Sequence, residues 1–402
     1  MKIVVPKEKK EGELRVPMVP SAAKTIAALA GATLVVEKSI GASIGFSDEE
    51  YSKAGANVAE DIASHLKEAD IVLHLNKPSV DDIQHYKEGA IVIGYLDPFQ
   101  DKDLLDAFCK QKLIALAMET MPRTTIAQKM DALSSQANLA GYRAVITAAA
   151  KLKKIFPMMI TPAGTISPAR VFVIGAGVAG LQAIATAKRL GARVEAFDVR
   201  PDAKEQIESL GAKCIQFDLG GETGQKGEMH AKELTEEQKK RQQELTEQHC
   251  ANMDVVITTA QVLGRKAPRI LTRKAIEGMK PGSIVIDMAV ESGGNVEGSK
   301  MNEEVVINGV TILGLPHLAA DAAVDASLMY ANNLAKMLEH FWDKEKDPEK
   351  NQGFLLNQED EILQGILLTH EGKIVHPWFQ NKESSPPPKE KEEETKPEEK
   401  KS

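Results

Sequence analysis

Short apolar runs rich in β-branched residues alternate with polar stretches of helical periodicity along the first quarter of the chain. The runs cover residues 3–6, 33–37, 71–75 and 91–96. Such an alternation is typical of βα units that build a parallel sheet. A further run at 113–117 follows, and beyond Gln128 the pattern becomes that of a long helix reaching towards Phe156. We expect this helix to bridge two domains.

A second α/β series begins at Val171. Its later apolar runs cover residues 194–197, 255–257, 283–288 and 311–313. After His317 comes another helical stretch over residues 325–342, and then a short β-like segment over 353–375. Two consecutive series of strands and helices predict an α/β protein with two Rossmann-like, doubly wound parallel-sheet domains.

The length of 402 residues and the hydrophobic content of 43% are sufficient for two cores of ordinary size. We place the first domain at residues 1–144, completed by residues 321–380 from the end of the chain, and the second at 145–320. Residues 381–402 contain Lys, Glu, Pro and other polar residues and no aliphatic or aromatic side chain. Such a segment cannot offset the entropy of ordering, so we expect a disordered charged tail.

The net charge of -8 argues against nucleic acid or an anionic membrane surface as a direct partner. The three cysteines, Cys109, Cys214 and Cys250, are scattered without metal-ligand spacing, so we expect neither a metal site nor a disulfide framework. The sequence has no apolar stretch of the length that a signal peptide or membrane span requires. We therefore expect a soluble chain with no direct membrane span.

The strand-like run at 171–174 leads directly into Gly175-Ala176-Gly177-Val178-Ala179-Gly180 and a helix over 181–190. In this context Gly175 permits a tight turn, Gly177 lets the backbone approach a pyrophosphate, and Gly180 allows the helix to pack closely on the strand. The helix N-terminus offers unpaired N–H groups to the phosphates. The motif predicts a Rossmann-type dinucleotide site.

Asp198 follows the next predicted strand, at the distance from the glycines where an acidic residue accepts the ribose hydroxyls. Because a carboxylate there repels a 2′-phosphate, we predict NAD(H) as the cofactor, although Arg200 leaves some room for looser specificity. Gln261 follows a predicted strand end and is placed to line the nucleotide groove. The predicted cofactor-binding residues are Gly175, Gly177, Val178, Gly180, Asp198, Val199, Arg200 and Gln261. The nucleotide should occupy a cleft between the two domains.

Three segments resemble the alanine dehydrogenase and pyridine-nucleotide transhydrogenase superfamily: Lys7 to Val16, GVAGLQAIATAKRLGA, and MKPGSIVIDMAVESGGN. The resemblance extends over nearly the whole chain to Trp378. Residues 122–144 are similar to the loop of the transhydrogenase NAD(H)-binding component. In that family, residues of this loop order the nicotinamide and reach the partner. The matching residues, which the resemblance implies as catalytic, are Arg123, Gln128, Asp131 and Ser134.

The resemblance further implies a proton-translocating transhydrogenase whose NADP(H) is held on a partner subunit. Its expected partners are the membrane-embedded second part of the alpha subunit and the NADP-binding beta subunit. It also implies a homodimer that is cytoplasmic and peripheral on the inner membrane through those subunits. His230 stands where the family has an aromatic residue in a flap over the nucleotide, so this sequence departs from the family there.

The first alternative is a self-sufficient alanine or related amino-acid dehydrogenase. Where the dehydrogenase pattern has its acid/base histidine, this chain has Asp97, and Lys77 stands near the position of the substrate-binding lysine but out of register. Amine oxidation needs a proton acceptor that titrates near the working pH, whereas transfer between two nicotinamides needs only close placement in a water-excluding site. The second alternative is a non-catalytic NAD-binding regulator.

For His317, at a predicted strand end, we favour packing or loop capping over catalysis.

Overall fold

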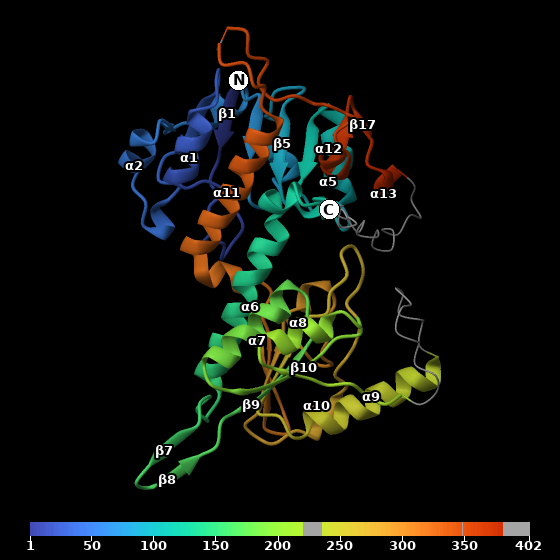
Figure 1. Ribbon diagram of the computed structural model, residues 1–402. Helices are drawn as coiled ribbons and strands as arrows, with labels where there is room; N and C mark the ends of the chain where they lie inside the picture. The colour runs from blue at the N-terminus through green and yellow to red at the C-terminus, as the bar shows by residue number, and fades with distance from the viewer. Residues whose placement is uncertain (220–234, 348, 381–402) are drawn as a thin grey trace, which may run out of the picture.

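The computed structural model describes residues 1–219, 235–347 and 349–380, which form two sheets joined by long helices (Figure 1). The first sheet has eight strands in the order β17-β16-β6-β5-β4-β1-β2-β3 within the described residues. Strands β1 to β6 pair in parallel, and β16 runs antiparallel to both β6 and β17. The strands are β1 (Lys2–Val5), β2 (Thr33–Glu37), β3 (Asn57–Ala59), β4 (Ile71–Leu73), β5 (Ile91–Gly94), β6 (Ile114–Ala117), β16 (Leu367–His370) and β17 (Lys373–Ile374).

The second sheet has seven strands in the order β11-β10-β9-β12-β13-β15-β14 within the described chain. All neighbours pair in parallel except β14, which runs antiparallel to β15. The strands are β9 (Arg170–Ile174), β10 (Arg193–Phe197), β11 (Lys213–Cys214), β12 (Val255–Thr258), β13 (Ile284–Asp287), β14 (Glu304–Ile307) and β15 (Val310–Gly314). Counted along the chain, the parallel strands of both sheets follow the doubly wound order 3-2-1-4-5-6. The predicted fold class is confirmed.

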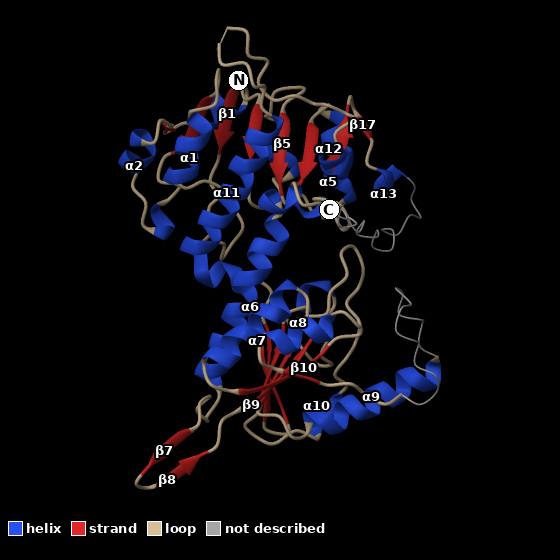
Figure 2. Ribbon diagram, viewed as in Figure 1, coloured by secondary structure: helices blue, strands red, loops and turns tan. Residues whose placement is uncertain are grey.

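Helices cover the faces of both sheets, as Figure 2 shows. The α-helices are α1 (Pro20–Ala27), α2 (Asp48–Lys53), α3 (Ile62–Leu66), α4 (Val80–Ile83), α5 (Lys102–Lys110), α6 (Ala132–Lys151), α7 (Val178–Arg189), α8 (Ala203–Ser209), α9 (Glu236–Cys250), α10 (Arg273–Glu277), α11 (Ala323–Phe341), α12 (Glu361–Ile366) and α13 (Pro377–Gln380). Short 3₁₀ segments are η1 (Ala42–Ile44), η2 (Met118–Thr120), η3 (Ala127–Met130), η4 (Val290–Ser292) and η5 (Leu318–Ala322). The strands β7 (Met159–Thr161) and β8 (Gly164–Ile166) form a separate hairpin.

Helix α6 leaves the first sheet and packs against α7 of the second (Figure 1). The contact is a close approach of two backbones at Gly141, where an added Cβ atom would lie 2.1 Å from the carbonyl oxygen of Ala179. Gln136, nearer the start of the same helix, accepts a hydrogen bond from Arg15 at 2.9 Å and donates to the Ala326 carbonyl of α11 at 2.9 Å. The predicted long helix therefore exists and spans both sheets.

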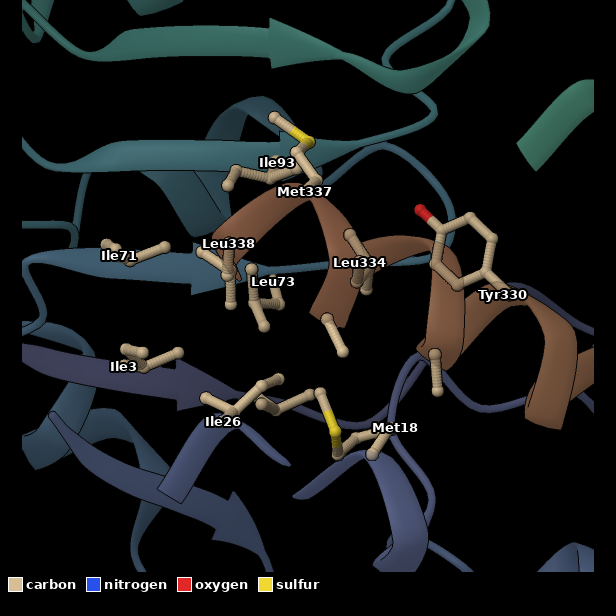
Figure 3. Packing of buried hydrophobic residues seen from close by; sticks show 14 of the residues in the cluster. Ile3, Met18, Ile26, Ile71, Leu73, Ile93, Tyr330, Leu334, Met337 and Leu338 are labelled. Carbon is tan, nitrogen blue, oxygen red and sulfur yellow. The ribbon is translucent and has the colours of Figure 1, made fainter. Parts of the chain in front are cut away.

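Helix α11 returns to the first sheet and completes its core. Figure 3 shows Tyr330, Leu334, Met337 and Leu338 of this helix packed over the strand residues Ile3, Ile71, Leu73 and Ile93, with Met18 and Ile26 beside them. All ten side chains are fully buried. The pairing of β16 with β6 brings a later segment to the same sheet. These contacts place residues from the end of the chain in the first core, while the numerical domain boundaries stay predictions.

No helix within the described ranges is long and apolar enough to cross a membrane. Two expectations, the charged tail at 381–402 and the flap histidine His230, lie outside the residues that the structure describes.

Candidate nucleotide-binding site

The glycine-rich turn joins β9 to α7. Gly175 has φ +100, and an added Cβ atom would lie 2.5 Å from Thr259 Oγ1; one at Gly180 would lie 1.8 Å from the Gly175 carbonyl oxygen. Around Gly177, in contrast, an added Cβ atom would meet nothing within 4 Å. Two glycines are therefore required by packing and strand–helix contact, whereas the third borders open space. That space fits the approach of a pyrophosphate.

The first turn of α7 can receive an anion. Its N-cap residue is Gly177, so no side chain caps the helix, and the first turn carries no acidic residue. The free N–H groups and the positive end of the helix dipole both favour phosphate oxygens. Val178, the first residue of the helix, is 37% exposed at this end.

Asp198 lies just beyond β10 and holds the turn. Its Oδ2 atom accepts the Ala176 N–H at 2.6 Å, while Oδ1 accepts the backbone N–H of Arg200 at 2.8 Å and its Nε at 3.0 Å. Burial alone would raise the pKa of Asp198, but the hydrogen bonds from Arg200 and Ala176 outweigh it and lower the pKa. The group is thus a carboxylate at neutral pH. Val199 beside it is 65% exposed.

The ends of β12 and β13 are tied together by buried polar groups. Asp287 is fully buried and accepts the N–H of Asn295 at 3.2 Å. Asn295 in turn accepts the Ala260 N–H at 3.1 Å and donates to the Ala260 carbonyl at 2.9 Å. Gln261 then donates to the Met288 carbonyl at 3.1 Å and is exposed. Gln261 therefore lies at the carboxyl ends of the strands. It is close to the glycine turn, because Thr259, two residues earlier, contacts Gly175.

Segment 121–131 connects η2 of the first domain to α6. The side chains of Arg123 and Gln128 are exposed and make no hydrogen bond or ion pair with any described residue. Asp131 and Ser134 are engaged: Asp131 is the N-cap of α6 and accepts the Ser134 N–H at 2.9 Å and its hydroxyl. The structure therefore separates the four loop residues into two that are free for an external group and two that fix the start of the helix.

The segment and the glycine turn are related through α6. Asp131 begins the helix and Gly141 contacts α7 next to the turn. A rise of about 1.5 Å per residue puts these positions about 15 Å apart along the helix axis. The four loop residues and the eight residues near the turn thus belong to two clusters linked by one rigid helix segment.

Asp97 takes part in ion pairs. Lys77 Nζ lies 3.0 Å from Asp97 Oδ2 and 2.8 Å from Asp101 Oδ2.

His317 Nε2 lies 3.5 Å from Glu291 Oε1 across the loops of the second sheet. Burial lowers the pKa of His317, and the charges of Lys10, Glu13 and Arg15 from the first domain also act on it.

Two features were missed by sequence reasoning. Phe99, after β5, contacts the loop after β12: an added Cβ atom at Gly264 would lie 2.4 Å from the Phe99 ring. The ring also packs on Phe379 and Trp378. Glu119, after β6, is buried and accepts N–H groups from the end of β5. An acidic residue just beyond a buried strand was a signal that could have identified Glu119, which follows the end of β6 by two positions. The Phe99 contact leaves no sequence signal.

The described residues near the glycine turn fit a dinucleotide. Open space at Gly177, an uncapped helix and a carboxylate beyond the second strand are the features that pyrophosphate and ribose require. Among the described residues, no group of three or more His, Cys, Asp or Glu is arranged to hold a metal.

Comparison with known proteins agrees with this geometry. Family models for the N-terminal and C-terminal domains of alanine dehydrogenase/PNT match residues 4–140 and 144–377. The first part of the NAD(P) transhydrogenase alpha subunit of Rhodospirillum rubrum is 43% identical over 94% of this chain and 98% of its own length. The protein of the same name from Rickettsia prowazekii is 43% identical over 96% of this chain and 99% of its own length.

A solved structure of transhydrogenase from Sinorhizobium meliloti superimposes with a TM-score of 0.80 at 42% identity, covering 94% of this chain and 99% of that one. A match of this extent includes both sheets and the helices between them. The resemblance noted in the sequence is confirmed, and the chain belongs to the alanine dehydrogenase/pyridine nucleotide transhydrogenase family, on the branch of the NAD(P) transhydrogenase alpha subunits.

Proposed function

We propose that this chain binds NAD(H) and passes the hydride of NADH to NADP⁺ held on a partner subunit. The observation that carries the proposal is the arrangement of segment 121–131. It presents the unpaired side chains of Arg123 and Gln128 at one end of α6, whose middle packs against the dinucleotide turn. A helix so placed joins nucleotide binding to an exposed site where a second nucleotide can approach.

NAD(H) is proposed over NADP(H) on this chain because of Asp198. Its carboxylate stays ionised through the hydrogen bonds from Arg200 and Ala176. At the ribose position a carboxylate accepts two hydroxyls and repels a phosphate. Arg200 already pairs with this carboxylate, so its guanidinium is not available to neutralise a 2′-phosphate. NADP(H) is therefore assigned to the partner.

Bound NADH would supply the hydride, and the residues of this chain would bind, orient and shield it. The uncapped start of α7 holds the pyrophosphate, and Asp198 fixes the adenosine ribose. Arg123 and Gln128 orient the nicotinamide, while Asp131 and Ser134 keep the segment at the start of α6. Direct transfer needs close placement of two rings and exclusion of water, and no general base.

The partners are proposed from the names of the relatives, which are parts of an alpha subunit. We place this chain at the cytoplasmic face of an inner membrane, attached to a membrane-embedded second alpha part and an NADP-binding beta subunit. Ile126, 59% exposed within segment 121–131, offers an apolar contact for such a partner. Coupling of transfer to proton movement would then belong to the membrane-embedded subunits.

A homodimer is supported by the β7–β8 hairpin, which projects away from both sheets (Figure 1). All six residues of its strands are exposed, and Ile160 is 72% exposed. An apolar two-stranded arm is marginal in water unless another surface covers it. Sedimentation of the wild-type chain beside Ile160→Asp tests this: the wild type should be a dimer and the variant a monomer.

The experiment that tests the function is hydride transfer from NADH to an NADP⁺ analogue after addition of an NADP-binding transhydrogenase component. Transfer should require both components, and the isolated chain should catalyse little. Gly177→Val is the matched control, because a side chain in the open space should abolish nucleotide binding while circular dichroism stays unchanged. Absence of transfer by the folded, NADH-binding wild type would instead favour a non-catalytic regulator.

The alternative of an amino-acid dehydrogenase is disfavoured by Asp97. In place of an acid/base histidine the chain has a carboxylate paired with Lys77 at 3.0 Å. The position therefore offers no imidazole to accept the proton of an amine. NADH formation with L-alanine and related amino acids decides the question, and robust turnover would reject the transhydrogenase assignment.

A further inference from the structure

Glu119 is a buried carboxyl group at the start of segment 121–131. Only 7% of the residue is exposed, and it lies in η2 directly after β6. Its Oε1 atom accepts the N–H of Leu96 at 2.8 Å and the N–H of Asp97 at 2.6 Å, just beyond β5. A single carboxyl oxygen therefore ties the start of the segment to the end of the neighbouring strand.

The other end of the segment is held by α11. Asn333 donates a hydrogen bond to the Lys129 carbonyl at 3.0 Å and accepts one from the Ser135 hydroxyl at 2.8 Å. Met130, between them, is fully buried. Because the side chains of Arg123 and Gln128 are exposed, their placement depends on the backbone anchors at the two ends.

The second oxygen of Glu119 is not satisfied. Oε2 is buried without a hydrogen-bond partner among the described residues, and so is the hydroxyl of Tyr95. Burial raises the pKa of Glu119 to about 7 although the backbone N–H groups lower it, and the charge of Asp97 raises it further. A buried carboxylate with one unpaired oxygen costs more free energy than the neutral acid, because the charged group loses more hydration on burial.

The surrounding titratable and charged groups come from α11 and from the loops before α1, after β4 and after β5. Tyr95 at the end of β5 and Tyr330 of α11 both have a raised pKa, chiefly through burial, and the charge of Glu119 contributes to both shifts. Arg15 acts on the same two hydroxyls in the opposite direction and is itself paired with Glu13. Asp97 is paired with Lys77. Neither cation makes a hydrogen bond or ion pair with Glu119 that would compensate its charge.

We propose that Glu119 is a positioning residue that fixes the start of segment 121–131, and that ionisation of its carboxyl group weakens this hold. Its effect on hydride transfer rests on the proposed function, but the hold itself is a property of this chain alone. Glu119 acts through the backbone at Leu96 and Asp97 and not on the reacting atoms. Opening of the segment exposes the carboxyl group to water and frees it from the buried, unsatisfied state.

Amide hydrogen exchange of residues 121–131 in the full isolated chain, corrected for intrinsic exchange, tests the hold. Because opening returns Glu119 to its ordinary acidity, protection should fall about tenfold per pH unit between pH 5 and pH 7 and level off above. Glu119→Gln keeps an oxygen for both N–H groups and cannot ionise, so its protection should not change with pH. Amides of β1 and β4 serve as an internal reference for global unfolding.

The matched control is Asp70→Asn, directly before β4 at the amino ends of the strands, where the carboxylate accepts the Lys2 N–H at 2.8 Å. It should keep the wild-type pH dependence in segment 121–131. Glu119→Ala removes the acceptor and should lower protection of the segment at every pH. A flat wild-type profile, or the same step in Glu119→Gln as in the wild type, overturns the proposal even if Glu119→Ala does not fold.

The consequence for transfer is measured separately in the reconstituted complex. Glu119→Ala should slow hydride transfer by about tenfold to a hundredfold, as expected for a displacement of about 1 Å at the reacting atoms. NADH affinity should change much less, and Glu119→Gln should restore the rate. If exchange behaves as expected while the wild-type complex transfers no hydride, the proposed function fails and the role of Glu119 in holding the segment stands.

Discussion

At the scale of single residues, the Asp198 carboxylate has a structural role beside its proposed role in binding the ribose. It accepts the Ala176 N–H inside the glycine turn, and it pairs with Arg200, whose Nη2 donates to the Ala176 carbonyl at 3.0 Å. The turn is thus closed by a carboxylate and a guanidinium before any nucleotide arrives. Ribose hydroxyls must share Asp198 with these donors, so the loss of the residue should affect both turn geometry and specificity.

Asp198→Asn should weaken NADH binding and relax discrimination against NADPH, since an amide keeps an acceptor but removes the charge that repels a 2′-phosphate. The expected loss is about 1–3 kcal/mol of binding free energy, about fivefold to 150-fold in Kd. Titration calorimetry with both nucleotides measures it. Arg200→Gln is the control that leaves the carboxylate in place, and unchanged NADH affinity in Asp198→Asn would show that the ribose site is elsewhere.

At the scale of elements, α6 joins a nucleotide-binding turn to a segment with two free side chains. Gly141 allows its close contact with α7, and the Asp131 cap fixes its first turn. The cap explains why two of the four residues suggested by the family loop have hydrogen-bond partners within the chain. Arg123 and Gln128 are the two left to act on an external group.

Arg123→Ala and Gln128→Asn should slow hydride transfer much more than they weaken NADH binding. These side chains orient the reacting ring, where a displacement of about 1 Å can lower the rate about a hundredfold, whereas adenosine and pyrophosphate contacts are made far from them. Stopped-flow transfer beside equilibrium binding on the same variants separates the two effects. A loss of rate only in proportion to lost binding would make the segment an ordinary structural turn.

A second contact between elements joins Phe99, after β5, to Gly264, after β12. Gly264 has φ +70, and its backbone lies against a ring that also packs on Phe379. Gly264→Ala should displace the loop that carries Gln261, at a cost of about 1–3 kcal/mol from overpacking and backbone strain. Thermal unfolding and NADH titration measure it. The double variant with Phe99→Ala should recover the overpacking part; no recovery would mean that the contact does not set the position of the loop.

At the scale of the whole molecule, buried titratable groups make stability depend on pH. His74 of the first domain is 6% exposed and shares a hydrogen bond of 2.8 Å with Tyr86. Burial lowers its pKa from 6.5 to about 4. The unfolded chain therefore binds more protons between these values, so the stability contributed by neutral His74 is complete above pH 6.5 and is lost as the pH falls towards 4.

This loss should amount to on the order of 3 kcal/mol, since each pKa unit corresponds to about 1.4 kcal/mol. Denaturant unfolding between pH 7 and pH 4 measures it. His74→Gln can still hydrogen-bond Tyr86 but does not titrate, so its stability should fall less across this range. His85→Gln, at an exposed position, is the control. Equal slopes for the wild type and His74→Gln would contradict the assignment.

The local sequence was sufficient for most parallel strands and for the dinucleotide turn. The expected β-like segment over 353–375 instead contains helix α12 (Glu361–Ile366) before β16 and β17, and the β7–β8 hairpin was not predicted. Strand and helix periodicity, the three glycines and the acidic residue after β10 all act within about thirty residues, the span of one βαβ unit. Arg123 and Gln128 rest on the match to the family loop alone, and their role stays a prediction. In the structure, Asp131 is the N-cap of α6 and accepts the N–H of Ser134, three residues later. Such a cap is a local feature, because it depends only on the spacing of these two residues.

The tertiary structure decided what holds these parts together. Glu119 reaches the end of β5, Phe99 meets Gly264, and Tyr330 donates to the His74 carbonyl at 2.7 Å across 256 positions of the chain. Such contacts depend on strand order and on the return of α11 to the first sheet, and no periodic pattern encodes which distant residues become neighbours. The sequence by itself therefore determined which residues we propose to bind a nucleotide, whereas packing between distant segments determined which of them are held in place and which have free side chains.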